Sequence, residues 1–444
     1  MIKPEQFLTT SLKAHPYGED ITRVLAAAIQ AVDPYQAISR HMRLMDEDLH
    51  LGGRTYALRR YRRIFLVGAG KAGLPMTQAV VDVLGSRIVD GVVIVKEGYG
   101  GPDKVGTVKI REAGHPVPDQ RGIAATREIL EILSHTEPDD LVIAVISGGG
   151  SALLTDPIPG VSLEELQTLT GMLLACGAEI GEINQIRRRL DQVKGGGLVR
   201  AADPARVAAL ILSDVVGDPL EYIASGPTVL SARNWQETRA IVEKYQLGEQ
   251  IPPHIRTALN SPPLPPFSLQ PPNNILVANN LTAANAAIQT AESLGYRAGL
   301  LTNTLSGEAR LVGQEYGEML KMLAEEETQR PVMWVAGGET TVTITGEGRG
   351  GRNQELALAA VPALSGSRNE ILVSLATDGG DGNTGAAGAV VTGESMQRAS
   401  ALGLDPAEYL ANNDSHTFFR HLGDCLMPGP TRTNVNDLLF LFSF

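Results

Sequence analysis

The chain has 444 residues, of which 43% are hydrophobic and 20% charged, and its formal net charge is −12. This composition is typical of a folded globular protein, and the length predicts two domains. The negative charge repels a phosphate backbone and so excludes non-specific nucleic-acid binding. Two cysteines are too few for a disulfide framework or a thiolate metal site.

Neither a signal peptide nor a membrane span is predicted. The first 20 residues contain no continuous apolar run, and no run in the chain approaches the roughly 20 residues that a membrane-spanning helix needs. We therefore expect a cytoplasmic protein that acts on a small molecule, with no nucleic-acid or membrane partner. Any assembly is expected to be a homodimer.

Six short aliphatic runs predict strands buried on both faces, as in mostly parallel sheets covered by helices. Each run leads into a cluster of glycine and polar residues, and a helical pattern follows. Ligands bind outside the carboxyl ends of such strands, which is where all six clusters fall. The expected fold class is therefore α/β. The runs are Ile64–Val67, Leu141–Ile146, Val207–Leu212, Ile275–Ala278, Val332–Ala336 and Ile371–Ala376.

A proline-rich segment divides the chain. Between Pro252 and Pro272, eight of 21 residues are proline, a density that argues against helix and central strand. We therefore predict an N-terminal domain over residues 1–250, a proline-rich linker over 251–272 and a C-terminal domain over 273–444.

The first run ends in Gly68-Ala69-Gly70-Lys71-Ala72-Gly73, which fits the dinucleotide-binding pattern G-x-G-x-x-G. Glu97 follows the next apolar segment, where a ribose-binding acid is expected, so a dehydrogenase stays open. Lys71 indicates a phosphoryl group instead, because an ammonium at a helix N-terminus lies where anions bind. A tight turn with a solvated lysine is the alternative. Gly68 and Gly70 are predicted to bind nucleotide.

A second glycine-rich loop follows the run Leu141–Ile146. Three consecutive glycines let successive backbone N–H groups converge on an anion, and a helix from Ala152 onwards would add its dipole. A serine nucleophile is the rival interpretation, but the G-x-S-x-G pattern is absent. The predicted phosphate-binding residues are Ser147, Gly148, Gly149, Gly150 and Ser151.

Four cations lie within eight residues of this acidic chain: Arg187, Arg188, Arg189 and Lys194. On a helix they point in different directions, and some are expected to be solvated surface. The others could bind a carboxylate or phosphate. We predict that Arg188 and Lys194 bind the substrate.

Pairs of carboxylates follow two of the predicted strands, Asp214 with Asp218 and Asp378 with Asp381. Acidic residues in glycine-rich turns often bond only their own backbone. At the ligand edge, however, they can hold Mg²⁺, which takes few protein oxygens plus water and phosphate. Asp214 and Asp378 are the predicted metal ligands. The histidines show no metal-ligand spacing, and His115 is interpreted as part of a rigid turn.

The segment Gly346–Gly351 predicts a flexible loop that carries Arg352 onto the substrate. Arginine binds carboxylates and phosphates through two parallel hydrogen bonds, which suits such a role. Three polar residues close to the ends of the last three predicted strands are expected to bind nucleotide: Asn280, Glu339 and Asp378.

Taken together, the motifs resemble the class II glycerate kinases, whose C-terminal part is called the MOFRL domain. The resemblance covers nearly the whole chain, and the ordered set is more specific than any single glycine motif. The matching segments are Gly68–Gly73, Gly114–Asp119, Ile146–Leu153, Asn184–Gly196, Leu212–Asp218, Ser225–Thr228, Gly337–Thr341, Gly350–Glu355, Thr377–Gly382 and Thr433–Asp437.

The resemblance implies a Rossmann-like N-terminal domain, a smaller α/β C-terminal domain and an active site in the cleft between them. It implies transfer of the γ-phosphoryl group of ATP, with Mg²⁺, to the 2-hydroxyl of D-glycerate. The residues that match the family's catalytic positions are Lys71, Asp214 and Arg352, and Asn434 is an expected substrate ligand.

Two other functions remain open. Family members were often labelled hydroxypyruvate reductases, and the G-x-G-x-x-G pattern alone is compatible with an NAD(P)H-dependent hydroxypyruvate or tartronate-semialdehyde reductase. A non-catalytic nucleotide sensor is a weaker alternative, because sensing does not require two acidic turns in addition to Lys71 and Arg352.

Overall fold

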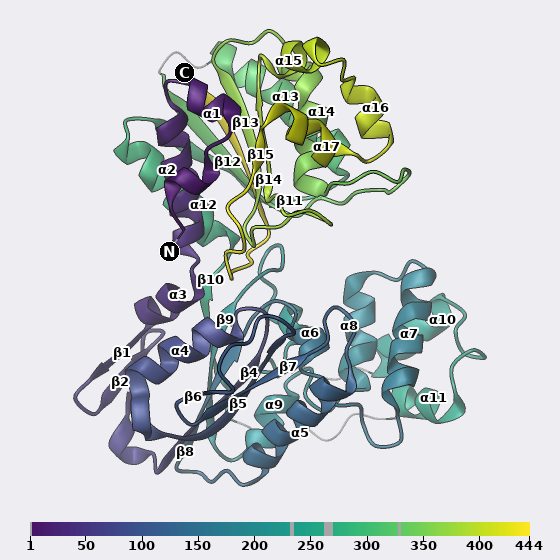
Figure 1. The fold of residues 1–444 in the computed structure, drawn as a ribbon. Coiled ribbons are helices and arrows are strands. Elements are labelled where there is room, and N and C mark those ends of the chain that lie inside the picture. Colours follow the sequence, from purple (N-terminus) through teal and green to yellow (C-terminus); the bar gives the residue numbers. More distant parts are fainter. Residues whose placement is uncertain (1, 231–234, 262–269, 327–329) are drawn as a thin grey trace. The chain divides into compact units, whose positions relative to one another are not determined.

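The computed structural model describes residues 2–230, 235–261, 270–326 and 330–444, which form two compact units. The central unit is Pro34–Val277, and the terminal unit joins residues 1–33 to residues 278–444. The division predicted from the sequence put residues 1–33 in the N-terminal domain. They belong to the terminal unit because helix α2 (Gly18–Ala31) packs along helix α12 (Asn280–Ser293), as Figure 1 shows.

Among the described residues, seven strands form the sheet of the central unit, in the order β10-β9-β8-β4-β5-β7-β6. Strands β4, β5, β7, β8 and β9 run parallel, and the short edge strand β6 is antiparallel to β7. The strands are β4 (Arg63–Ala69), β5 (Ile88–Lys96), β6 (Lys104–Val105), β7 (Val108–Ala113), β8 (Asp140–Ile146), β9 (Arg206–Leu212) and β10 (Asn273–Ala278).

Read from β7 to β10, this order is the 3-2-1-4-5-6 order of doubly wound dinucleotide-binding folds, so the predicted Rossmann-like sheet is confirmed. The direction of winding reverses between β4 and β8, where Ala69 lies opposite Ile146. In such folds the crevice outside the strand ends at this point binds the ligand.

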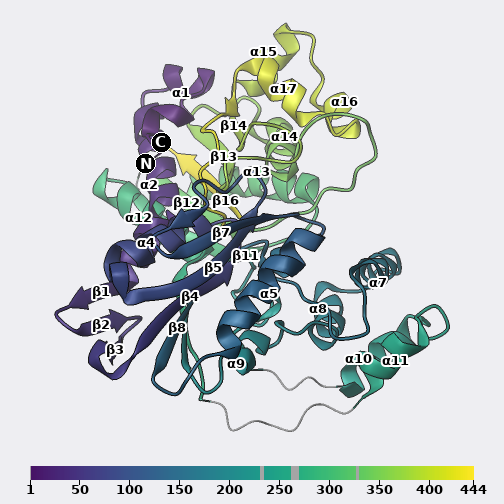
Figure 2. The same cartoon turned by 60° about the horizontal axis from the view of Figure 1, so that its bottom comes forward.

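Helices cover both faces of this sheet (Figure 2). One face packs against α5 and α9 through a core that includes Val67, Ile129 and Leu198, and α4 contacts the strands separately. A three-stranded antiparallel sheet precedes the main one. The elements are α3 (Pro34–His41), β1 (Met42–Met45), β2 (Asp48–Leu51), β3 (Arg54–Ala57), α4 (Gly73–Leu84), α5 (Gln120–Ser134), α6 (Gly150–Leu153) and α9 (Gly197–Ala202).

Four further helices of the central unit form their own apolar core, which includes Leu169, Ile186 and Ile255. They are α7 (Leu163–Ala175), α8 (Ile180–Arg189), α10 (Trp235–Lys244) and α11 (Pro253–Asn260). The prediction of a linker without helix over 251–272 is therefore wrong at α11. Prolines at the N-cap and first position are compatible with a helix, because no partner is needed there for a backbone N–H. Residues 262–269 of that linker lie outside the described residues.

The sheet of the terminal unit has the order β11-β12-β16-β13-β14-β15 and is mixed. Strand β16 lies between β12 and β13 and is antiparallel to both, so those two strands run in the same direction. The polar residues after β12 and β13 therefore gather at one edge, where β16 begins. The strands are β11 (Arg297–Leu305), β12 (Val332–Gly338), β13 (Glu370–Ala376), β14 (Gly388–Thr392), β15 (Cys425–Leu426) and β16 (Asp437–Ser443).

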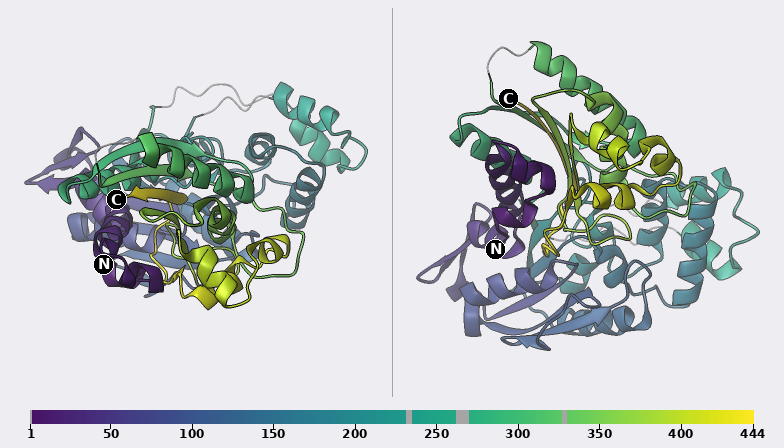
Figure 3. Two further views of the ribbon diagram at one scale, coloured as in Figure 1. Left: turned by 90° about the horizontal axis from the view of Figure 1, so that it is seen from above. Right: turned by 45° about the horizontal axis from the view of Figure 1, so that its top comes forward.

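In the terminal unit α2 and α12 cover one face of the sheet, and α13 and α14 cover the other (Figure 3, right). The smaller helices α15, α16 and α17 pack beside α14. In the part of the chain that the structure describes, no helix has both the length and the apolar character needed to cross a bilayer. The remaining helices are α1 (Thr10–Ala14), α13 (Ala309–Glu326), α14 (Arg352–Leu364), α15 (Ser395–Ala401), α16 (Pro406–Ala411) and α17 (Ser415–Leu422).

Candidate active site

The two predicted glycine loops of the central unit touch each other. Because β4 and β8 are parallel neighbours, the loops that follow them leave the sheet side by side. The backbone N–H of Lys71 donates to the carbonyl oxygen of Gly148 at 2.8 Å, and that of Ala72 donates to Oγ of Ser147 at 3.1 Å. Lys71 thus lies beside the loop predicted to hold phosphate.

Asp214 joins these loops from the next strand, β9, which pairs with β8. Its carboxylate lies directly against Gly148, since a Cβ added there would be 1.9 Å from Oδ2 of Asp214. Only glycine leaves room for that carboxylate. Three predicted groups, Lys71, the 147–151 loop and Asp214, are therefore brought together where the winding of the sheet reverses.

His115 is a member of this cluster that the sequence interpretation missed. A Cβ added to Gly149 would lie 3.1 Å from Nε2 of His115 and 3.4 Å from Cγ of Lys71. Burial, together with the positive charges of Lys71 and Lys96, lowers the pKa of His115 to about 4. His115 is therefore neutral near pH 7 and adds no charge beside Lys71. His115 follows closely after the segment that forms β7, and this position at a strand end is the sequence feature that could have indicated a place in the site.

The helix expected after the second glycine loop is short. Helix α6 has four residues, so the dipole that the sequence suggested contributes little. The loop itself keeps the predicted character. Within the described ranges, the N–H groups of Gly148 and Gly149 donate to no backbone carbonyl. Gly149 has the left-handed conformation (φ 82°), in which neighbouring amides can converge on an anion.

The two cations predicted to bind substrate are instead held inside the central unit. Lys194 is only 1% exposed, and its ammonium donates to the Leu154 carbonyl at 2.9 Å and to Thr155 Oγ1 and Asp191 Oδ2 at 3.0 Å each. Its three N–H groups are thus used within the protein.

Arg188 is also buried. It donates to the carbonyl oxygen of Glu221, and its guanidinium lies 5.6 Å from the centre of the Tyr222 ring. The substrate-binding prediction for Arg188 and Lys194 does not fit these contacts. Their neighbour Arg187 is only half-buried and lines a cavity, to whose wall Lys194 also contributes.

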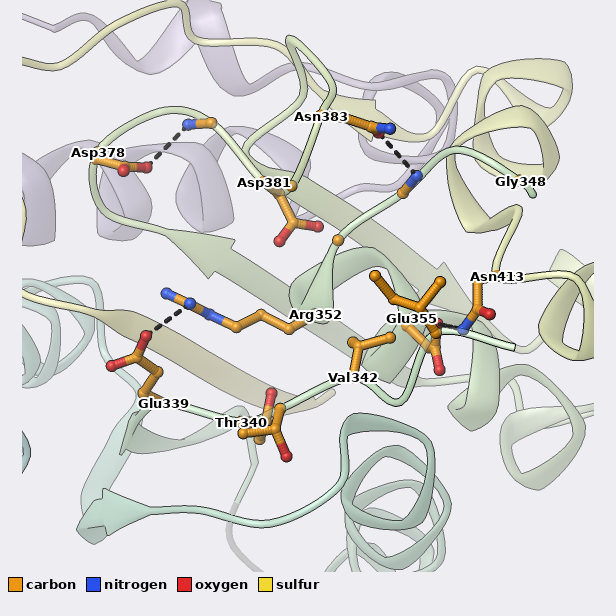
Figure 4. Close-up of a pocket in the computed structure, with 16 residues that line it drawn as sticks. Glu339, Thr340, Val342, Gly348, Arg352, Glu355, Asp378, Asp381, Asn383 and Asn413 are labelled. Atoms are coloured by element: carbon orange, nitrogen blue, oxygen red, sulfur yellow. Dashed lines mark hydrogen bonds and ion pairs between the residues drawn. The ribbon is translucent and has the colours of Figure 1, made fainter. Parts of the chain in front are cut away.

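A separate cavity of about 670 Å³ lies in the terminal unit (Figure 4). Residues after β12, at the start of α14 and after β13 line it. Glu339, Arg352 and Asp378 are among them. Glu339 and Asp378 lie after strand ends, as expected, and Arg352 begins α14. The Asp378 carboxylate accepts a hydrogen bond from the Gly380 N–H at 3.0 Å.

Arg352 is held between two carboxylates. Its Nη1 donates to Glu339 Oε1 at 2.7 Å, and its Nε and Nη2 donate to the two carboxylate oxygens of Asp437 at 2.5 and 3.2 Å. Burial lowers the pKa of Arg352, but Asp437 and Glu339 outweigh it, so the pKa stays above its ordinary value. The side chain is a fixed positive charge with one face toward the cavity.

The segment Gly346–Gly351 is not the free loop that its glycines suggested. The N–H groups of residues 346–349 donate to side chains and backbone of residues 412–414, including Gly346 to Asn413 Oδ1 at 3.0 Å and Arg349 to Asp414 Oδ1 at 2.9 Å. Glycine is required there for close packing rather than for motion, since a Cβ on Gly346 would lie 2.4 Å from the Asn412 carbonyl oxygen.

Asp381 anchors the first turn of α14. Its carboxylate accepts hydrogen bonds from the backbone and side-chain N–H groups of both Asn353 and Gln354, at 2.9 to 3.3 Å. Burial raises the pKa of Asp381, and these hydrogen bonds act in the opposite sense. Asp381 therefore positions Arg352, the first residue of that helix.

Two predicted ligands have local roles instead. The side-chain amide nitrogen of Asn280 donates to the carbonyl oxygens of Val435 and Asp437, both at 2.9 Å, and joins α12 to the start of β16. Oδ1 of Asn434 accepts the N–H of Asn436 at 3.1 Å within its own turn. Neither residue lines the cavity of Figure 4, so the predictions that Asn280 binds nucleotide and Asn434 binds substrate gain no support.

The predicted metal ligands lie in different units, Asp214 in the central one and Asp378 in the terminal one. In the described parts of the chain no three histidine, cysteine or acidic side chains gather as a metal site. Mg²⁺ bound to a nucleotide needs only one or two protein carboxylates, because phosphate and water supply the other oxygens. The carboxylate of Asp214 or that of Asp378 alone would fit such an ion.

Comparison with known proteins points to one family. The chain matches the family model described as "Domain of unknown function (DUF4147)" over residues 20–260 and the "MOFRL family" over residues 332–437. It is 38% identical to the glycerate 2-kinase of Pyrococcus horikoshii, over 94% of this chain and 95% of that protein. It is 39% identical to the D-glycerate 2-kinase of Thermotoga maritima, over 94% and 96%.

The fold agrees with a solved member. The crystal structure of a glycerate kinase from Thermotoga maritima superposes with a TM-score of 0.86 and 38% identity, covering 95% of this chain and 98% of that one.

Proposed function

The chain belongs to the MOFRL-type glycerate kinase family, and from that premise we propose that it transfers the γ-phosphoryl group of ATP to the 2-hydroxyl of D-glycerate. The products are 2-phosphoglycerate and ADP. The observation that carries the proposal is the meeting of Lys71, the 147–151 loop and Asp214 at the point where the central sheet reverses its winding.

In the proposed reaction the 2-hydroxyl oxygen attacks the γ-phosphorus, the bond to the ADP oxygen breaks, and the hydroxyl proton passes to the carboxylate of Asp214. The Lys71 ammonium and the Arg352 guanidinium stabilise the negative charge on the transferred group. The N–H groups of Gly148 and Gly149, which donate to no backbone carbonyl in the described ranges, hold phosphate oxygens. Neutral His115 keeps its place beside Lys71 without repelling the cation.

Asp214 and Asp378 offer the carboxylate oxygens that would hold Mg²⁺, which neutralises part of the triphosphate charge when bound. Glu339 and Asp437 keep Arg352 in a fixed orientation, so its N–H groups need no reorganisation during transfer.

The reductase alternative depends on Glu97 as a ribose ligand. The Glu97 side chain is 65% exposed, and its carboxylate accepts a hydrogen bond from Arg121 at 3.0 Å. A carboxylate already paired with an arginine is poorly suited to bind a ribose. A dinucleotide pyrophosphate requires only the first glycine loop, so the reductase alternative does not explain Lys71 and the second glycine loop.

The purified protein should form ADP only when ATP, D-glycerate and Mg²⁺ are all present, and EDTA should abolish the activity. ADP is measured by chromatography, so that no nicotinamide-coupled assay interferes. The Asp214→Asn variant serves as the matched control, with kcat expected to fall about 10²- to 10⁴-fold. Oxidation of NADH or NADPH by hydroxypyruvate, without any ADP formed from ATP, would instead identify a reductase.

A further inference from the structure

A second cavity, of about 520 Å³, adjoins the glycine loop of the central unit. Gly149 and Ser151 line it together with His115, and the loop position of Gly149 is the one that lies against Lys71. The cavity therefore opens beside the groups that are proposed to hold the phosphates.

Much of the wall is apolar. Val117 and Leu174 line the cavity and are 60% and 63% exposed, although both are large aliphatic side chains. Leu166 and Pro118 line it as well. Covering such side chains with apolar ligand surface is favourable, at about 25 cal/mol for each Å² removed from water. Glycerate carries an oxygen on each of its three carbons and offers no such surface. A nucleoside matches both the volume and the apolar wall.

Arg187, from α8, supplies a positive charge to the same cavity. It is half-buried, yet its guanidinium makes no hydrogen bond or ion pair with any residue in the described ranges. The carboxylate of Asp191, which attracts it, is itself bound to the Lys194 ammonium at 3.0 Å. A partly desolvated guanidinium that has no hydrogen-bond partner in the described ranges is suited to pair with an anionic ligand group.

The cavity lies beside the phosphate-binding loop, has an apolar wall and is lined by Arg187, whose guanidinium makes no hydrogen bond in the described ranges. We infer that it binds the nucleoside and α-phosphate of the nucleotide, with Arg187 paired to the α-phosphate. The inference rests on the proposed kinase function and extends it, because it assigns the nucleoside to the central unit. It also excludes glycerate from this cavity.

Gly171 allows a direct test. It lines the cavity from within α7, and a Cβ added there meets no atom within 4 Å. Gly171→Leu therefore adds apolar volume at the wall of the cavity from a position whose Cβ meets no neighbour, and the helix itself gains from losing a glycine. Ala175→Leu is the matched control, since Ala175 is exposed on the same helix and does not line the cavity. Arg187→Met removes the charge at similar length.

Binding of ADP is measured by calorimetry, and KM for ATP and D-glycerate by steady-state kinetics. Gly171→Leu and Arg187→Met should each weaken ADP binding and raise KM for ATP at least tenfold. KM for D-glycerate should change less than twofold, and Ala175→Leu should match the wild type. A rise in KM for D-glycerate with unchanged ADP affinity would assign the cavity to the acceptor and overturn the inference.

The result can be separated from failure of the proposed function. If the wild type binds ADP and phosphorylates glycerate but both variants behave like it, only the cavity inference is wrong. If the wild-type protein binds neither ATP nor ADP, the kinase proposal and the inference are both wrong.

Discussion

Replacement of Lys71 by methionine is expected to lower kcat at least about 10²-fold, while the fold and the KM for D-glycerate stay close to those of the wild type. The contact that orders the loop comes from the Lys71 backbone N–H, which donates to Gly148, and this bond survives the substitution. Methionine keeps most of the side-chain length, so only the ammonium is removed. Steady-state kinetics and circular dichroism measure the two effects.

Lys104→Met is the control for loss of a positive charge elsewhere, because Lys104 is exposed on the edge strand β6. It should have wild-type kcat. A Lys71→Met enzyme that keeps kcat within threefold of the wild type would show that the ammonium does not act on the transferred group.

Replacement of Arg352 by lysine is expected to lower both activity and stability. A lysine ammonium cannot form the two parallel hydrogen bonds to Asp437 and the third to Glu339. We expect kcat to fall about 10²-fold and the free energy of unfolding to fall by about 2 kcal/mol, since the buried Asp437 carboxylate is left poorly paired. Kinetics and urea denaturation measure the two changes.

A double variant separates these effects. Combining Arg352→Lys with Asp437→Asn removes the poorly paired carboxylate, so stability should recover toward the wild-type value while kcat stays low. If kcat recovers together with stability, Arg352 serves only the structure of the terminal unit, and its assigned role in phosphoryl transfer is wrong.

Six strands of the two sheets could be predicted because a strand buried on both faces leaves a local signal, a continuous aliphatic run such as Leu141–Ile146. They are β4, β8, β9, β10, β12 and β13. The placement of β16 could not be predicted from the sequence. Its sequence, Leu438 to Phe442, has the same apolar character, but nothing local specifies that it inserts antiparallel between β12 and β13. Likewise residues 1–33 join the terminal unit through tertiary contacts of α2 with α12.

The glycine loops and Asp214 could be predicted for a similar reason: each follows its strand directly, and the parallel order brings the strand ends together. The roles of the cationic side chains could not be predicted as well from the sequence. The sequence does not distinguish Lys194 from a substrate-binding lysine, and only the folded structure shows that its ammonium donates to Leu154, Thr155 and Asp191. Arg352 is paired with Glu339 and Asp437, which lie 13 and 85 residues away from it in the sequence, so no local pattern predicts these ion pairs.

The position of the new phosphate ester tests the central claim most directly. The reaction mixture with ATP, Mg²⁺ and D-glycerate is treated with enolase, which converts 2-phosphoglycerate but not the 3-isomer to phosphoenolpyruvate. We predict that phosphoenolpyruvate and the 2-phosphoglycerate in equilibrium with it together equal the ADP formed, without added phosphoglycerate mutase, and that Lys71→Met forms them at least about 10²-fold more slowly. Phosphoenolpyruvate that appears only after the mutase is added, or no phosphorylated product at all, would contradict transfer to the 2-hydroxyl.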